Sequence, residues 1–409
     1  MDEIGRCYLY LALHLDRHVE GFVDAYFGPP EFKAEIQTGN PRSLEALADD
    51  AQQLLSAIES DVPDTQRKGY LSKQVQAMAA VIGSLSGDQI DFVREVELYF
   101  DITPEMVDEA VFEAAHAEMA ELLPGEGTLI ERVVARREKL YLEPDRILPV
   151  FDLALRETRR RTKELVDLPP GEDLTLHLVE DEPWSAYNWY LGGFRSRIDL
   201  NTDLPIRADS AVPLIAHEAY AGHHTEHAIK EQHLYRRLGR AEHAVQLLLA
   251  PESVIAEGIA DNAEQILFDD AELVAFLQDQ LYPLAGISGL DAGKQVRMRR
   301  AAEALRGVSG NAALLLHQEG CAPEEIQRYI ERYGLRTPEE ASQNLRFITD
   351  PNFRSYVFNY DVGKALLAPL LQEANAAANF ERLLSEPYTP SLVRLWLAQK
   401  SLGESSEGA

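Results

Sequence analysis

The sequence predicts a mainly helical α+β protein that carries one small antiparallel sheet. Two observations favour this fold class. Apolar residues recur at three- and four-residue steps through most of the 409-residue chain, which is typical of amphipathic helices. Near residues 173–180 and 189–201 they fall instead at every second position, which is typical of strands. The sheet is therefore expected in the middle of the chain, between two sets of helices.

Helical patterns fill the first part of the chain. Residues 3–27 place one apolar face along a helix, through Ile4, Tyr8, Leu11, Leu15, Val19, Phe22 and Tyr26. The Gly-Pro-Pro sequence at 28–30 is expected to end that helix, because proline lacks the N–H that a helix interior needs. Further helices are expected over 43–59, 67–85, 88–100, 104–122 and 128–166, the last interrupted near Pro144. We therefore expect residues 1–166 to form a helical scaffold half.

The second part combines the predicted strands with more helices. After Pro205 the helical pattern returns, and helices are expected near 210–237, 241–249, 251–268, 271–282, 291–306, 309–319, 323–333, 338–346, 353–373 and 378–384. Together with the small sheet they should form a second half over residues 167–400. Residues 401–409 are polar and rich in Gly and Ser, so a disordered tail is expected there.

Charge and composition exclude several classes of partner. Lys and Arg number 39 against 68 Asp and Glu, which gives a net charge of −29. A field of this sign repels nucleic acids and anionic lipid, so neither is expected as a partner. The sequence has no run of 18 apolar residues that could span a membrane. Its two cysteines, and a start at Met1 without the features of a signal peptide, favour the cytoplasm.

The densest chemistry in the chain lies at residues 217–227, which read His-Glu-Ala-Tyr-Ala-Gly-His-His-Thr-Glu-His. A His-Glu pair on a helix is typical of zinc hydrolases when a second His follows four residues after the first, but position 221 is Ala. On a regular helix His223 would lie about 120° around the axis from His217, and His224 about 10 Å further along it. Two ligands of one zinc need a bulge, which Gly222 could permit.

We therefore favour His217 and His223 as metal ligands and keep His224 as a substitute for His223. Two alternatives stay open at this point. The histidines could be solvated surface residues, or His223 and His227 could bind a metal as an ordinary i, i+4 pair.

A catalytic zinc needs a third protein ligand and an open position for water. Glu257 is the candidate, because it lies between Ala256 and Gly258 in an otherwise apolar helix. The missing side chain at 258 should let another backbone come close. The alternative is that Glu257 belongs to a solvated acidic stripe with Asp261 and Glu264.

In this arrangement Glu218 acts as the base and takes a proton from the zinc-bound water. Two imidazoles and a carboxylate suit one Zn²⁺ ion best, while cobalt or manganese stays open.

Three motifs resemble those of bacterial proteins catalogued as domain-of-unknown-function family 885, which look like distant relatives of gluzincin metallopeptidases. Residues 217–224 resemble the family's His-Glu-x-x-Pro-Gly-His-His. Residues 257–264 resemble its Glu-Gly-Trp-Ala-x-Tyr-x-Glu, and residues 359–364, Asn-Tyr-Asp-Val-Gly-Lys, resemble its Ser-Tyr-x-x-Gly-[Lys/Arg]. The similarity covers about residues 170–375.

The resemblance implies a large helical zincin-like architecture, with the sheet beside the active site and the catalytic half at 167–400. It implies that His217, His223 and Glu257 are the ligands, that Glu218 is the base, and that Tyr360 hydrogen-bonds the oxyanion. The sequence departs from the family where Ala221 replaces Pro, Ile259 replaces Trp and Asn262 replaces Tyr. The last two lie near the expected site, so we expect a substrate preference different from that of the family.

Substrate contacts are expected along the second predicted strand. The resemblance implies an edge strand beside the metal that pairs with extended substrate backbone, and the strand at 192–201 is the candidate. Arg195, Arg197 and Asp199 share one of its faces and could meet a substrate carboxylate or amine, and Arg354 could do the same near Tyr360. The alternative for each arginine is an ordinary exposed position.

The function favoured by the sequence is a zinc-dependent hydrolase of amide bonds, a peptidase whose substrate is a peptide or small amide. One alternative is a non-catalytic helical protein that binds a metal or a peptide. Another is a two-metal carboxylate enzyme that uses His223, His227 and Glu226, although 251–268 lacks the Glu-x-x-His spacing usual in such bundles.

Overall fold

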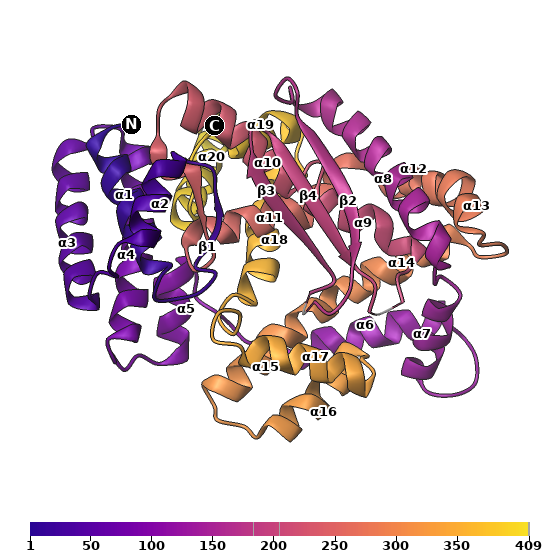
Figure 1. The fold of residues 1–409 in the computed structure, drawn as a ribbon. Coiled ribbons are helices and arrows are strands. Elements are labelled where there is room, and N and C mark those ends of the chain that lie inside the picture. Colours follow the sequence, from indigo (N-terminus) through magenta and orange to yellow (C-terminus); the bar gives the residue numbers. More distant parts are fainter. Residues whose placement is uncertain (183, 204, 408–409) are drawn as a thin grey trace.

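The computed structural model describes residues 1–182, 184–203 and 205–407. Helices dominate, and the strands form a three-stranded and a two-stranded sheet. The helices of residues 3–100 lie on one side of the molecule, those of residues 109–165 lie on the opposite side, and the three-stranded sheet lies near the middle (Figure 1). Among the described residues no helix combines the length and the apolar character that crossing a bilayer requires. The predicted fold class is confirmed.

The first part of the chain forms eight α-helices and one strand. They are α1 (Glu3–Leu15), β1 (Val23–Tyr26), α2 (Pro30–Thr38), α3 (Leu44–Asp61), α4 (Thr65–Leu85), α5 (Phe92–Phe100), α6 (Glu109–Leu122), α7 (Leu129–Glu138) and α8 (Pro144–Leu165). Side-chain caps explain several starts: Asp2, Ser43 and Asp91 each accept a backbone N–H from the first turn that follows, which satisfies a donor that the helix itself cannot.

The second part of the chain begins with the strands β2 (Asp173–Val179), β3 (Ala186–Gly192) and β4 (Arg195–Asn201). There follow η1 (Ala208–Ser210), α9 (Ala211–Glu218), α10 (His223–Lys230), η2 (Glu231–Arg237), η3 (Ala241–Ala244), β5 (Val245–Leu247), α11 (Pro251–Leu267), α12 (Asp270–Phe276), η4 (Leu277–Leu281), α13 (Tyr282–Ala285), α14 (Ala292–Ala302), η5 (Glu303–Arg306), α15 (Gly307–His317), α16 (Pro323–Gly334), α17 (Pro338–Thr349), α18 (Phe358–Leu371), α19 (Ala376–Ser385) and α20 (Pro390–Glu407).

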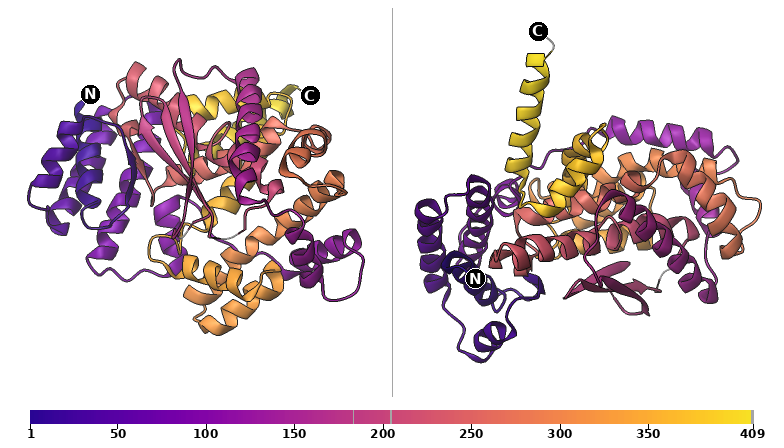
Figure 2. Two further views of the ribbon diagram at one scale, coloured as in Figure 1. Left: turned by 45° about the vertical axis from the view of Figure 1, so that its right-hand side comes forward. Right: turned by 90° about the horizontal axis from the view of Figure 1, so that it is seen from above.

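Several predicted elements differ from the observed ones. The helix expected over 3–27 ends at Leu15, and residues 23–26 form β1, which pairs antiparallel with β5. The helix expected over 241–249 is the short η3 followed by β5. The apolar pattern cannot distinguish a short buried strand from a helical turn. The tail expected over 401–409 is helical as far as Glu407, and residues 408 and 409 lie outside the described part. Figure 2 shows α20 extending away from the body of the molecule.

The three-stranded sheet has the order β2-β4-β3. The hairpin of β3 and β4 is antiparallel, as expected, whereas β2 and β4 are parallel. The strand predicted to form the edge, β4, therefore lies in the centre, and β3 is the edge strand on the side of α9 and α10. The correction matters, because only an edge strand can pair with a further extended chain.

Two large apolar cores hold the fold together, and both cross the expected boundary near residue 166. One joins Phe151 of α8 to Ile215 of α9 and Ile259 of α11. The other joins Tyr8 and Val75 of the first part to residues of β5, α11 and α15. Burial of apolar surface is the main stabilising contribution to folding, so the two parts stabilise each other.

Helices α11 and α18 cross at two glycines. A Cβ atom on Gly258 would lie 2.6 Å from the carbonyl oxygen of Gly363, and one on Gly363 would lie 2.4 Å from that of Val254. The close backbone approach predicted at residue 258 is therefore present. This crossing brings Glu257 of α11, the predicted third metal ligand, beside the segment that leads into α18.

Candidate metal centre

The helix that carries the histidines is broken. Helix α9 ends at Glu218 and α10 begins at His223. Ala221 has a φ of 75° in the left-handed region, and its N–H donates to Oγ1 of Thr225 over 3.1 Å. Gly222 has a negative φ of −94°, but a Cβ there would lie 1.8 Å from the carbonyl oxygen of His217. The predicted interruption is present, although Gly222 provides space while Ala221 adopts the unusual backbone angle.

The unwound turn brings the three predicted ligands together. His217, His223 and Glu257 each offer one ligand atom, and these atoms lie within 4.8 Å of one another. Nε2 of His217 lies 3.4 Å from Oε2 of Glu257, and Nε2 of His223 lies 3.8 Å from its Oε1. The two imidazole rings are nearly perpendicular, with centroids 4.8 Å apart.

The donor set fits a zinc ion. Two ligands about 2.1 Å from zinc at a tetrahedral angle are about 3.4 Å apart, close to the shorter separations in this cluster. Oε2 of Glu257 is buried and has no hydrogen-bond partner, and a buried carboxylate oxygen without a partner is costly unless a cation satisfies it. Two imidazoles and one carboxylate leave a fourth position for substrate or water.

Asp261 fixes the orientation of His217. Nδ1 of His217 lies 3.2 Å from Oδ1 of Asp261. Burial lowers the pKa of His217, but the hydrogen bond that its ring donates to Asp261 and the charges of Glu218 and Glu257 outweigh it and raise that pKa to about 9. Such a carboxylate selects the ring nitrogen that faces a metal and makes it more basic.

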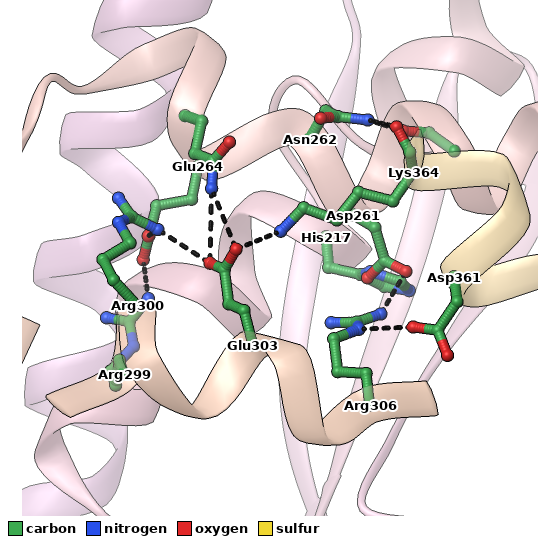
Figure 3. A network of polar contacts seen from close by, with 12 residues as sticks. His217, Asp261, Asn262, Glu264, Arg299, Arg300, Glu303, Arg306, Asp361 and Lys364 are labelled. Carbon is green, nitrogen blue, oxygen red and sulfur yellow. Dashed lines mark hydrogen bonds and ion pairs between the residues drawn. The ribbon is translucent and has the colours of Figure 1, made fainter. Parts of the chain in front are cut away.

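A charged network continues behind Asp261 (Figure 3). Arg306 donates to Asp261 and, from Nε over 3.2 Å, to Asp361. A cavity of about 250 Å³ borders this network and is lined in part by His217, Asp261, Arg306 and Lys364. Lys364 lies 3.1 Å from Glu303. The cationic side chains named here are therefore held by acidic partners.

Glu257 is held by a tyrosine that the sequence analysis did not identify. The hydroxyl of Tyr356 donates to Oε1 of Glu257 over 2.7 Å. Burial raises the pKa of Glu257 to about 8. Tyr360, the expected oxyanion donor, packs against Tyr356 with ring centroids 5.7 Å apart. Burial raises the pKa of the Tyr360 hydroxyl, and the charges of Glu257, Asp261 and Glu218 raise it further.

Glu218, the expected base, is half-buried at the end of α9. Burial raises the pKa of its carboxyl, and the neighbouring His217 opposes this shift. The backbone carbonyl of Glu218 accepts a hydrogen bond from Nδ2 of Asn188 on β3, over 2.5 Å. The edge strand and the candidate base are thus tied together.

His224, the substitute ligand, points away from the centre. It is fully buried, and its ring nitrogens contact Oγ of Ser196 at 2.8 Å and Oε2 of Glu172 at 3.3 Å. The hydroxyl of Tyr220 donates to the same oxygen of Glu172 over 2.6 Å. His224 therefore anchors α10 to the sheet, and the substitute is corrected in favour of His223.

The His223–His227 alternative is also not supported by the geometry. Nδ1 of His227 contacts Nε2 of Gln246 at 3.1 Å, and the two histidine rings stack at 6.1 Å. Glu226 is engaged by Lys230, which lies 2.7 Å from it and 2.9 Å from Glu252. These groups form a buried ion-pair cluster separate from the metal ligands.

The three predicted substrate arginines do not converge on the centre. Arg197 pairs with Asp199 at 2.8 Å on the central strand, and Asp199 also accepts from the Trp189 indole over 2.9 Å. Arg354 pairs with Glu95, with Nε 3.0 Å from Oε1. Arg195 is exposed at the start of β4. Because β4 is the central strand, neither Arg195 nor Arg197 is part of the sheet edge that faces the helices, and Arg354 lies outside the sheet, before α18.

Asp24 of β1 is a further site residue that the sequence analysis missed. It is half-buried and accepts a hydrogen bond from the hydroxyl of Tyr187 on β3. Burial and the charge of Glu218 raise its pKa to about 7. No local signal could have identified Asp24, because its segment reads as the end of a helix. For Asp261, by contrast, the i+4 spacing from Glu257 was a usable signal.

No family model and no curated protein matches the chain, so the resemblance to family 885 stays a prediction. Solved structures are similar in fold. One, described as "the putative lipoprotein from Colwellia psychrerythraea", has a TM-score of 0.52 and 15% identity over 90% of this chain and 70% of its own. A "putative lipoprotein of unknown function" from Shewanella oneidensis has a TM-score of 0.50 and 14% identity over 90% and 76%. Metallocarboxypeptidase 1 of Trypanosoma cruzi has a TM-score of 0.39 and 15% identity over 93% and 87%.

Proposed function

We propose that this protein is a zinc-dependent hydrolase of amide bonds, and that its substrates are peptides. The observation that carries the proposal is the convergence of His217, His223 and Glu257, whose ligand atoms lie within 4.8 Å. Glu218 directly follows the first ligand. This combination of two imidazoles, a ligand carboxylate and an adjacent free carboxylate is what metal-assisted hydrolysis requires.

A zinc ion held there supplies a Lewis acid that polarises the substrate carbonyl and makes a bound water acidic near pH 7. The carboxylate of Glu218 takes a proton from the attacking water and passes it to the leaving amine. The hydroxyl of Tyr360 donates a hydrogen bond to the oxygen that becomes negative. Asp261 and Tyr356 keep His217 and Glu257 in position.

We propose β3, in place of β4, as the strand that pairs with the substrate backbone. It is the edge of the three-stranded sheet, and Asn188 connects it to Glu218. The cytoplasm remains our proposed location, and both cysteines, Cys7 and Cys321, are free thiols.

The metal is tested by elemental analysis of the purified protein beside the variants His217→Ala and His177→Ala. His177 is an exposed residue of β2, so its replacement is a matched control. We expect about one equivalent of zinc in the parent and the control, and a strong loss in His217→Ala. Equal metal content in all three proteins would reject the centre.

Catalysis is tested with Glu218→Gln and a peptide library. The variant is expected to keep its metal and to lose cleavage by a factor of at least about 100. A parent protein that binds zinc but cleaves no peptide would support instead a metal-binding protein without catalysis.

A further inference from the structure

The free edge of β3 is covered along part of its length by β1. The hydroxyl of Tyr187 donates to Asp24, and the Tyr190 ring lies 5.2 Å from that of Phe27, which directly follows β1. A Cβ atom on Gly192 would lie 2.6 Å from Cβ of Phe27. β1 and Phe27 therefore occupy the space that an extended peptide would need along the edge from Tyr187 to Gly192.

Asp24 lies where this covered stretch begins. Consecutive residues of a strand point to opposite faces, and Tyr187 reaches Asp24 of β1 while Asn188 reaches the carbonyl of Glu218 on α9. The edge of β3 thus lies between Asp24 and the candidate base. Burial, and after it the charge of Glu218, raise the pKa of the Asp24 carboxyl.

Two acceptor groups lie beside β3, Asp24 with Tyr187 on one face of the strand and the Asn188 amide on the other. Among the described residues no lysine, arginine or histidine forms an ion pair with Asp24, and the Tyr187 hydroxyl donates a hydrogen bond to it. Asn188 is 9% exposed, and its Oδ1 is buried without a hydrogen-bond partner. Arg306 of the charged network behind the metal centre is not available to Asp24, because it pairs with Asp261. A half-buried carboxylate without a cationic partner is costly, so Asp24 favours a ligand that brings donors and a positive charge.

Aromatic side chains surround the same position. The ring of Tyr187 lies 5.5 Å from Trp184 and 4.6 Å from Trp189, and Trp189 is 38% exposed. The guanidinium of Arg197 already lies over the Trp189 ring, 5.6 Å from its centroid. The Tyr187 ring beside the Asp24 carboxylate attracts an ammonium group through the ring quadrupole and the charge together.

We propose that Asp24, positioned by Tyr187, binds the protonated amino terminus of the substrate, so that the protein removes residues from the free N-terminal end of peptides. This inference rests on the proposed hydrolase function. The ammonium group offers three donors and one positive charge, which matches the Asp24 carboxylate at the point where β1 stops the peptide. A substrate peptide whose backbone ends at Tyr187 places its terminal amino group beside Asp24.

Three equimolar tripeptide libraries test the proposal with the zinc-loaded parent protein. One has free amino termini, one is N-acetylated, and one is N-acetylated with lysine first, which offers a side-chain ammonium instead. We expect kcat/KM for the free library to exceed that for the acetylated one by at least about tenfold, as for loss of a hydrogen bond to a charged group. Equal rates for the first two libraries would overturn the inference, and so would preference for the lysine library over the free one. Cleavage of none would reject the proposed function itself.

Variants provide a readout that does not depend on turnover. In a Glu218→Gln background, calorimetry should show binding of the free library that Asp24→Asn weakens at least about tenfold. Binding of the acetylated library should be unchanged. Asp279→Asn, at an exposed residue of η4, is the control for loss of one acid. If Asp24→Asn does not fold, Tyr187→Phe keeps the carboxylate and should weaken the same binding. Full affinity in a folded Asp24→Asn or Tyr187→Phe protein would refute the assignment.

Discussion

The hydroxyl of Tyr356 donates a hydrogen bond to Oε1 of Glu257 over 2.7 Å, within a buried pair. This contact leaves Oε2 of Glu257 without a hydrogen-bond partner and directed at the centre, 3.4 Å from Nε2 of His217. Tyr356 thereby determines which oxygen of the ligand carboxylate is available for a metal.

Tyr356→Phe removes this hydrogen bond and little else, because the ring is kept. We expect zinc affinity to fall by about 10–100-fold, the usual effect of losing a partner that orients a metal ligand. Competition with a chromophoric chelator measures it. Tyr360→Phe is the comparison: it should bind zinc normally and lower kcat. Unchanged affinity in Tyr356→Phe would contradict the role given to this hydroxyl.

Asp261→Asn should affect the other side of the centre. The amide can no longer accept with a charged oxygen from Nδ1 of His217, so the ligand nitrogen becomes less basic. Zinc affinity is expected to fall by about 10–100-fold, as measured by the same competition assay. Asp361→Asn is a matched control, since Asp361 contacts Arg306 and not His217. It should have a small effect, and comparable losses in both variants would indicate a general disturbance of the network.

Zinc affinity should rise steeply with pH. Without metal the pKa of His217 is about 9 and that of Glu257 about 8, so at pH 7 the cluster holds protons that an ion must displace. Binding should release about one to two protons per ion at pH 7. The apparent affinity should then increase up to about pH 8–9 and level off above it. Calorimetry in buffers of different ionisation enthalpy measures the release. Affinity independent of pH between 6 and 8 would contradict this picture.

Gly222→Ala should destroy the site. The added Cβ would lie 1.8 Å from the carbonyl oxygen of His217 and 2.4 Å from that of Ala216, and backbone cannot rotate away as a side chain can. We expect loss of zinc and a fall in unfolding free energy of at least about 3 kcal/mol. Metal content and chemical denaturation measure the two effects. Gly293→Ala, whose Cβ meets only side-chain atoms within 4 Å, is the control and should be tolerated.

The sequence predicted those parts of the site that depend on local spacing. His217, His223 and Glu257 were identifiable because histidines cluster around Gly222 and an acidic residue lies in an apolar helix beside Gly258. The helices could be predicted as well, because apolar periodicity also depends on local spacing. His223 could not be separated from His224 by spacing, because the choice depends on how the turn unwinds and on Glu172 and Ser196, which hold His224 from other elements.

The remaining site residues come from long-range pairing, which periodicity does not report. Asp24 reaches Tyr187 of β3 from the strand β1, which pairs with β5. The order of the sheet placed β3 at its edge. Tyr356 reaches Glu257 through the glycine crossing of α11 and α18. Arg354 looked available in the sequence, but its partner Glu95 lies on a distant helix.

The pairing of β1 with β5 also constrains the order of events during synthesis. A ribosome releases residues 23–26 long before residues 245–247 exist, yet Val23 and Tyr26 find their partners at Leu247 and Val245. Until then the residues of β1 have no strand to pair with. Unpaired strand edges promote aggregation, so we expect chaperones to bind the growing chain. Slow translation of the central region would prolong that exposed interval, so codon choice there should influence yield more than codon choice near the carboxyl end.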